Sequence, residues 1–106
     1  MNDLILKVKI KEVNPYGSPK IDMSDEDFQA HGFLFGDVLD IFFDNGYTVY
    51  DVPYLSGFYI KRGKPVIVSY PQDPNPTICY NYLSMAKEGN IKADVEVTLV
   101  LKEKGK

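Results

Sequence analysis

Hydrophobic and polar residues alternate along the first strand-length segment of the chain. Within Leu4–Val13 the hydrophobic positions from 6 to 10 are even-numbered, and the lysines from 7 to 11 are odd-numbered. This period of two predicts a β-strand with one face buried. Further short extended segments follow, separated by Gly, Pro and Asn: Val38–Phe43, Tyr47–Val52, Tyr54–Ile60, Pro65–Tyr70, Thr77–Tyr82 and Val95–Leu101. We therefore expect a mainly β protein, a small antiparallel β-barrel of about six to seven strands.

Two local signals refine this expectation. Asn45-Gly46 lies between two strand segments, and both residue types tolerate a positive φ, so we expect a type I′ hairpin there. In that register Asp40 faces Asp51.

Ser24 precedes three acidic residues, a pattern typical of a helix start, and Gly32 ends that helix about two turns later. A second helical turn is expected over Leu83–Lys87.

The length of 106 residues corresponds to one domain, which we place over residues 1–106. No window of about 18 apolar residues is present, so we expect no membrane-spanning helix. The chain begins Met1-Asn2-Asp3 and lacks the pattern of a secretory signal, so a cytoplasmic location is expected. One histidine and one cysteine cannot form a zinc site of the usual kind, and we expect no metal and no cofactor.

Charge is distributed unevenly along the sequence. The interval Ile21–Ile60 contains no Lys or Arg and carries eight acidic residues, whereas the rest of the chain holds 12 bases and 15 − 8 = 7 acids. This distribution argues against nucleic-acid binding, which needs clustered Lys and Arg. It predicts instead an acidic and a basic face, through which two copies of the chain could associate.

Few residues offer catalytic chemistry. Cys79 lies in a β-rich segment, and we interpret it as a structural cysteine. We interpret His31 as a surface cap at the end of the expected helix. Asp40 and Asp51, if paired, would repel, and one pKa of such a pair rises, as in general acid/base sites. A hydrated edge on which both carboxylates stay charged is the simpler interpretation. We therefore assign no catalytic residue.

Two stretches resemble the C-terminal β-barrel domain of the S-adenosylmethionine hydroxide adenosyltransferases, relatives of the fluorinase and chlorinase. The first is Lys9–Ile21, which matches a strand and turn that open that domain. The second runs from Gly63 through Ile78-Cys79-Tyr80-Asn81-Tyr82 to Val97. The overall pattern is most similar to a related barrel at the N-terminus of some bacterial tyrosine-phosphatase-like proteins, which implies that residues 1–106 are the N-terminal domain of a longer protein.

The resemblance also points to a surface. Tyr16 stands where the family has Phe, Gly17 matches its Gly, and Ser18 stands where the family has an adenosine-contacting Asn. In that family a separate N-terminal domain supplies most of the catalytic polar groups, so the resemblance implies a barrel without them. The tyrosines of the second half add flat, apolar faces with polar tips, which suit a heterocycle or a partner surface.

These observations lead to one hypothesis and one alternative. The chain is expected to be a non-catalytic binding or accessory module that recognises a small nucleoside-like ligand or a protein partner. Its candidate ligand-binding residues are Tyr16, Gly17, Ser18, Tyr80, Asn81 and Tyr82. The alternative is an accessory part of a larger bacterial hydrolase or phosphatase whose catalytic domain follows Lys106.

Overall fold

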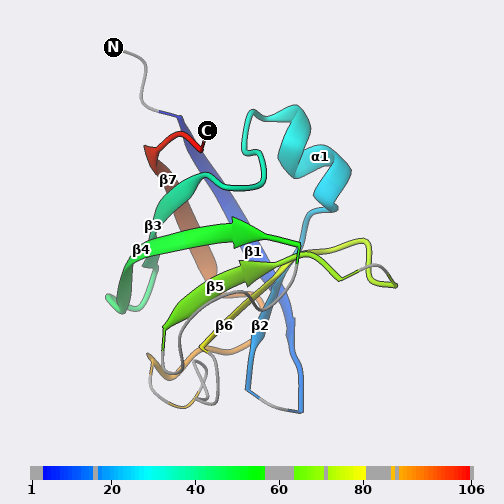
Figure 1. Cartoon of the computed structure of the whole chain (residues 1–106). Coiled ribbons are helices and arrows are strands. Elements are labelled where there is room, and N and C mark those ends of the chain that lie inside the picture. The colour runs from blue at the N-terminus through cyan, green and yellow to red at the C-terminus, as the bar shows by residue number, and fades with distance from the viewer. Residues whose placement is uncertain are drawn as a thin grey trace.

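The chain forms a closed barrel of seven strands within the described residues, capped at one end by a short helix (Figure 1). The computed structural model describes residues 4–15, 17–56, 64–70, 72–80, 87 and 89–105. The elements follow one another as β1 (Ile5–Val13), β2 (Pro19–Ile21), α1 (Asp25–Ala30), β3 (Val38–Phe43), β4 (Thr48–Leu55), β5 (Pro65–Val68), β6 (Thr77–Tyr80) and β7 (Glu96–Glu103). The mainly β class and the small barrel are thus confirmed.

Around the barrel the strand order is β1-β2-β6-β5-β4-β3-β7. All neighbours are antiparallel except β4 and β5, which pair in parallel through Tyr54 with Ile67 and Leu55 with Val68. The predicted antiparallel barrel therefore differs from the structure at one strand pair, β4 and β5. Antiparallel neighbours can be joined by a tight turn, whereas a parallel pair needs a connection long enough to run back along the strand. Along the sequence, residues 56–64 connect the two strands.

The β3–β4 hairpin differs from the expected type I′ turn. Only Gly46 has a positive φ, of +94°, and Asn45 does not, whereas a type I′ turn needs both. Gly46 N–H donates to the Phe43 carbonyl and Phe43 N–H donates to the Tyr47 carbonyl, which makes a three-residue connection. The Asn45 amide explains the choice, because its Oδ1 accepts the Tyr47 N–H and its Nδ2 donates to the Gly89 carbonyl.

This longer turn displaces the register by one residue. Phe42 pairs with Thr48 and Ile41 with Val49, rather than Phe43 with Thr48 as expected. A β-bulge between Leu39 and Ile41 restores the expected register further along, where Leu39 pairs with Val52. A bulge places two residues of one strand opposite one of the other, so Asp40 lies against the Tyr50–Asp51 pair.

Helix α1 begins as the sequence predicts. Ser24 is the N-cap, and its hydroxyl accepts the Asp27 N–H at 3.1 Å. His31 is the exposed C-cap, which confirms its interpretation as a surface cap, and Gly32 follows with a φ of +108°. Phe28 is the buried residue of the helix, and it stacks on Phe33 at a ring-centroid distance of 4.6 Å. The helix therefore covers one end of the barrel with a single aromatic anchor. The expected helical turn at Leu83–Lys87 lies outside the described residues except for Lys87.

The barrel has one main core inside it and a small second cluster outside its wall. Alternate residues of a strand point to opposite faces, and in β5 Ile67 joins the main core while Val66 and Val68 belong to the second cluster with Cys79 of β6. All four residues are buried. This arrangement is typical of strands that are covered on both faces. No helix among the described residues is both long and apolar enough to span a membrane.

Candidate functional site

The described part of the turn between β1 and β2 carries the predicted ligand-binding residues Gly17 and Ser18. The Asn14 side chain holds this turn, because its Oδ1 accepts the Ser18 N–H at 3.0 Å. The backbone adds two hydrogen bonds: Gly17 N–H donates to the Asn14 carbonyl, and Asn14 N–H donates to the Ser18 carbonyl. Gly17 has a φ of +81°, in the region that favours glycine. These contacts define the backbone at the described turn residues Asn14, Gly17 and Ser18.

Ser18 points to the neighbouring strand β6, where it meets Cys79. Both side chains are buried. Burial raises the pKa of the Cys79 thiol to about 12, and a hydrogen bond from Ser18 opposes this rise only in part. Since the thiolate is the nucleophilic form, Cys79 is unreactive at neutral pH. It serves as a packing residue of the outer cluster, against Val66 and Val68.

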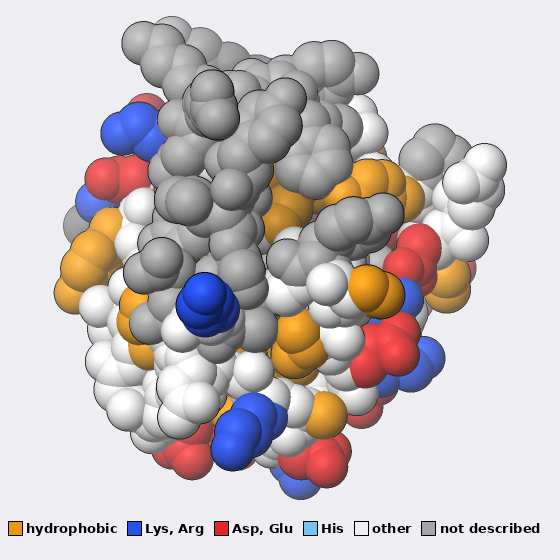
Figure 2. All heavy atoms as spheres, turned by 90° about the horizontal axis from the view of Figure 1, so that it is seen from below, with side chains coloured by type: hydrophobic (Ala, Val, Ile, Leu, Met, Phe, Trp, Pro, Cys, Tyr) orange, Lys and Arg blue, Asp and Glu red, His pale blue; other side chains and the backbone are white. Residues whose placement is uncertain are grey.

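The contact between Ser18 and Cys79 joins the last residue of the first candidate group to the residue that directly precedes the second. β2 and β6 are neighbours through Lys20 and Thr77, and Tyr80 follows directly after Cys79. The side chain of Tyr80 is not among those described, and Tyr16, Asn81 and Tyr82 lie outside the described residues. The β1–β2 turn and the end of β6 both lie in the lower part of Figure 1. Seen from that side, acidic side chains lie around the rim of the molecule, with hydrophobic ones nearer the middle (Figure 2).

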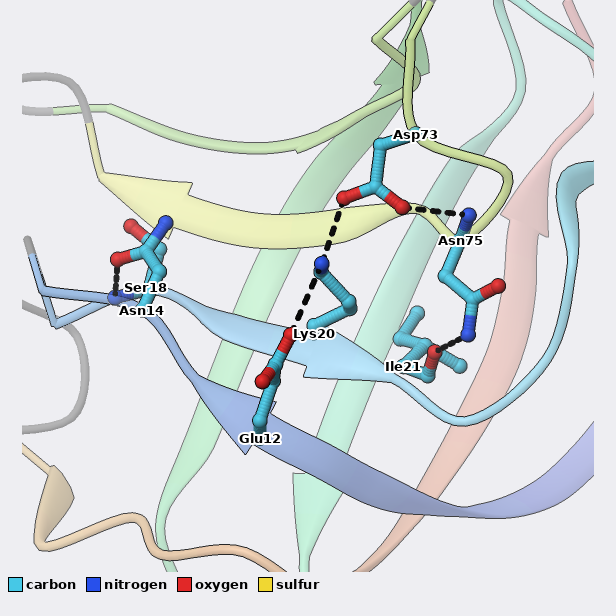
Figure 3. A network of polar contacts seen from close by, with 7 residues as sticks. All are labelled: Glu12, Asn14, Ser18, Lys20, Ile21, Asp73 and Asn75. Carbon is cyan, nitrogen blue, oxygen red and sulfur yellow. Dashed lines mark hydrogen bonds and ion pairs between the residues drawn. The ribbon is translucent and has the colours of Figure 1, made fainter.

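A polar network fixes β2 beside this turn (Figure 3). The Lys20 ammonium bridges two carboxylates, Glu12 of β1 at 3.0 Å and Asp73 at 2.7 Å. The hydrogen bond to Asp73, followed by that to Glu12, raises the pKa of Lys20, so the ammonium keeps its proton. Asp73 Oδ1 also accepts the Asn75 N–H, and the buried Asn75 amide donates to the Ile21 carbonyl. Lys20 thus acts as a structural clamp and is not available as a base.

The predicted carboxylate pair is brought together on the other side of the barrel. The Asp51 N–H donates to Asp40 Oδ1 at 3.1 Å, within the β3–β4 bulge. Lys102 of β7 lies 2.6 Å from Asp51 Oδ1 and 3.8 Å from Asp40 Oδ1. Lys102 thus lies close to both carboxylates, and the three side chains form an ion cluster at the surface.

This cluster and the β1–β2 turn do not form one site. Asp40 lies opposite Val100 of β7, and Val100 lies opposite Ile5 at the start of β1, whereas the β1–β2 turn follows the other end of that strand. The two groups of predicted residues must therefore be considered separately. Among the described residues, no group of three or more His, Cys, Asp and Glu side chains is placed to hold a metal ion.

One buried polar network was not predicted at all. The Tyr54 hydroxyl, fully buried, donates to Asp25 Oδ1 at 2.5 Å and accepts from the Gln29 amide at 3.3 Å. Ser69 donates to the other oxygen of Asp25 at 2.8 Å. Burial and the hydrogen bond to Asp25 raise the pKa of Tyr54 above its usual value, so the phenol stays protonated. The Ser24-Asp25 helix start was the only sequence signal here, and it indicated a cap rather than a link to β4.

A second unpredicted group is the buried carboxylate of Asp37. Burial alone would raise its pKa, but hydrogen bonds from Leu34 N–H, Lys104 Nζ and Gly105 N–H together lower it. The three donors lie at 2.8, 2.8 and 2.7 Å. Asp37 is thus a charged buried group that joins its own turn to the two residues after β7. No local sequence pattern predicted its pairing with Lys104.

The chain matches no protein family and no curated protein. Among solved structures, an uncharacterized conserved protein from Thermotoga maritima is similar, with a TM-score of 0.76 at 13% sequence identity. The similarity covers 88% of this chain and 35% of that one, so the chain spans about a third of the length of its neighbour. At this identity the likeness shows the barrel fold alone. The resemblance to the adenosyltransferase barrel stays a prediction.

Proposed function

We propose that the barrel is a non-catalytic binding or accessory module. Its proposed binding residues are those predicted from the sequence, namely Tyr16, Gly17, Ser18, Tyr80, Asn81 and Tyr82. Of these, Gly17 and Ser18 lie in the β1–β2 turn, and β2 is a neighbour of β6. The supporting observation is the contact between Ser18 and Cys79, because Ser18 belongs to one candidate group and Cys79 directly precedes the other, which is distant in sequence. A small nucleoside-like molecule is the proposed ligand, on the basis of the resemblance to an adenosine-contacting turn.

The state of the reactive side chains supports a role without catalysis. The Cys79 thiol has a pKa raised to about 12, mainly by burial, and the Tyr54 phenol has a raised pKa for the same main reason. Lys20 is held between two carboxylates, and Lys102 pairs with Asp51 and lies near Asp40. General bases and nucleophiles need pKa values moved toward neutrality. The shifts found at these residues run in the opposite direction or serve an ion pair.

The longer Thermotoga neighbour supports the accessory version of the proposal. In that protein the same barrel fold accounts for only part of the chain. An accessory domain of a larger hydrolase or phosphatase would have this kind of arrangement. A barrel in such a position contributes a binding surface, while the chemistry belongs to another domain.

Ligand binding can be tested by titrating the protein with adenosine, S-adenosylmethionine and inorganic phosphate while following tyrosine fluorescence and the melting temperature. We expect adenosine or S-adenosylmethionine to raise the melting temperature, and the Asn81→Ala variant to abolish that rise. Asp44→Asn, a change in the exposed β3–β4 turn, is the matched control and should bind as the wild type does. If none of the three compounds produces a response, the small-ligand version is wrong and a protein partner remains.

Self-association through acidic and basic faces is a separate version of the partner proposal. Sedimentation at low and at high salt distinguishes it, because attraction between exposed charges weakens as ionic strength rises. A dimer at low salt that dissociates at high salt would support it. A monomer under both conditions rules it out.

A further inference from the structure

The connection between α1 and β3 presents two large hydrophobic side chains to solvent. Leu34 is 50% exposed and Phe35 is 45% exposed, although the neighbouring Phe33 is fully buried. The backbone of this turn, residues 33–37, is closely held. Asp37 N–H donates to the Leu34 carbonyl, and Gly36 N–H donates to the Tyr54 carbonyl of β4 at 2.8 Å. The exposed positions of Leu34 and Phe35 are therefore imposed by a defined turn.

The two residues after β7 are attached to this turn at three points. Lys104 Nζ donates to Asp37 Oδ2 at 2.8 Å and to the Gly32 carbonyl at 3.1 Å, at the end of α1. Gly105 N–H donates to Asp37 Oδ1 at 2.7 Å. All these bonds fall on the α1–β3 connection, and none belongs to a β-ladder. They can open without breaking the barrel.

Gly105 also packs directly against Gly36. A Cβ atom on Gly105 would lie 2.6 Å from the Gly36 carbonyl carbon, which is too close for any side chain. Gly36 itself has a φ of +95°, in the region that favours glycine. The approach of the two backbones therefore requires glycine at 105, whereas glycine at 36 is favoured by its positive φ, since a Cβ there would lie 3.6 Å from Gly105 Cα.

One carboxylate connects these contacts. Asp37 Oδ2 accepts both the Leu34 N–H within the turn and Lys104 Nζ from the end of the chain, while Oδ1 accepts Gly105 N–H. The Asp37 side chain is only 1% exposed, so a partner lost from it is not readily replaced by water. Detaching residues 104–105 thus leaves a buried charge short of donors within the turn that it stabilises.

We propose that residues 104–105 act as a strap that holds the turn 33–37 in its observed form. The display of Leu34 and Phe35 then depends on whether the strap is attached. Local opening of this kind involves few buried contacts and precedes global unfolding. The turn lies with α1 at the upper end of Figure 1, away from the β1–β2 turn, so this proposal does not depend on the ligand proposed there.

Amide hydrogen exchange measured by NMR on the full chain tests the strap. Gly105→Ala should detach it, and we expect the amides of Leu34 and Gly36 to exchange at least tenfold faster, while the amide of Ile41 in β3 is unchanged. Lys104→Met removes only the charged contact and should give a smaller rise at the same two amides. Gly46→Ala is the control, since it strains a turn at the other end of β3 where a Cβ meets no atom within 4 Å.

The outcomes separate cleanly. A selective rise at Leu34 and Gly36 in Gly105→Ala, absent in Gly46→Ala, supports the strap. If the Gly105→Ala variant loses protection at residue 105 but keeps wild-type exchange at Leu34, the turn stands without the strap and the proposal is wrong. Retained protection at residue 105 in that variant also contradicts it, because the contact with Gly36 would then tolerate a side chain. Equal rises in both variants would show a global loss of stability and likewise overturn it.

Discussion

Removing the Tyr54 hydroxyl should destabilise the barrel far more than removing the hydroxyl of an exposed tyrosine. Tyr54→Phe keeps the ring, which lies edge-on to Phe28 at a centroid distance of 4.8 Å, and deletes only the hydroxyl. That hydroxyl donates to Asp25 at 2.5 Å and accepts from Gln29 at 3.3 Å. A hydrogen bond to a charged group contributes about 1.5–3 kcal/mol, and the half-buried Asp25 regains some hydration from solvent, so we expect a loss of about 2 kcal/mol.

The matched control is Tyr50→Phe. Tyr50 is 56% exposed, and its ring contacts Phe42 at 6.0 Å, a contact that the Phe ring preserves. Surface substitutions of this kind change stability by less than about 0.5 kcal/mol. Urea unfolding followed by circular dichroism measures both free energies of unfolding. For a chain of about 100 residues, 2 kcal/mol corresponds to a fall in melting temperature of roughly 8 °C.

The pH dependence provides an independent check on Tyr54. Its pKa is raised in the folded state, first by burial and then by the hydrogen bond to Asp25. A group with a raised folded pKa contributes stability that is complete below its unfolded pKa, here the ordinary tyrosine value of 10.0, and is lost as the pH rises through the folded pKa. The wild type should therefore lose more stability above pH 10 than Tyr54→Phe does. If Tyr54→Phe and Tyr50→Phe cost the same, the hydroxyl of Tyr54 does not link helix α1 to the barrel.

Three further changes test other parts of the molecule. Asp51→Gly should leave the free energy of unfolding in urea unchanged or raise it by up to about 1 kcal/mol. The reason is that Asp51 has a φ of +58°, which favours glycine, and that its contact with Lys102 is exposed and contributes little. A clear loss of stability would contradict this. Cys79 should react with a thiol reagent at pH 8 at least about 100-fold more slowly in the native state than in urea, since burial raises its pKa to about 12; equal rates would refute it. Asp37→Asn should lower the free energy of unfolding by about 2–4 kcal/mol at pH 7. The lowered pKa of Asp37 stabilises the fold above its unfolded pKa of 3.8, and this stability is lost as the pH falls, so the variant should lack that part of the acid unfolding. Identical acid-unfolding profiles of the variant and the wild type would exclude this role.

Local sequence patterns predicted individual strands and the helix start. They did not predict the features of the fold that depend on pairing between residues distant in sequence. The alternation in Leu4–Val13 and the Ser24 cap depend on neighbours within a few residues, and both agree with the structure. The parallel pairing of β4 with β5 depends on where a connection places the second strand, which no local pattern records. β2 has only three residues, too few for alternation to reveal it.

The β3–β4 hairpin shows how a distant contact changes a local prediction. Asn45-Gly46 favours a two-residue turn when only its own backbone preferences are considered. The Asn45 side chain, however, bonds the Gly89 carbonyl, a partner 44 positions along the chain, while Asn45 itself keeps a negative φ. The register therefore moves by one residue until the bulge at Asp40 corrects it. Asp40 and Asp51 come together because of that bulge, and not through the register expected from the turn.

The interpretation of the charge distribution changes most when the folded structure is considered. The base-free interval Ile21–Ile60 predicted an acidic face opposed to a basic one. In the folded chain Lys102 and Lys104, both from outside the interval, reach three of its eight acids: Asp37, Asp40 and Asp51.

The end of the chain therefore neutralises part of the acidic segment. Lys104 pairs with a carboxylate that is 1% exposed, whereas Lys102 meets one that is 69% exposed. Exposed pairs contribute little to stability, and a buried carboxylate that loses its cation is costly. Among these ion pairs, the one at Asp37 therefore contributes most to stability. Attraction between the acidic and basic faces of two copies can involve only acidic residues that the barrel leaves unpaired, whereas the attachment of residues 104–105 depends on a buried carboxylate.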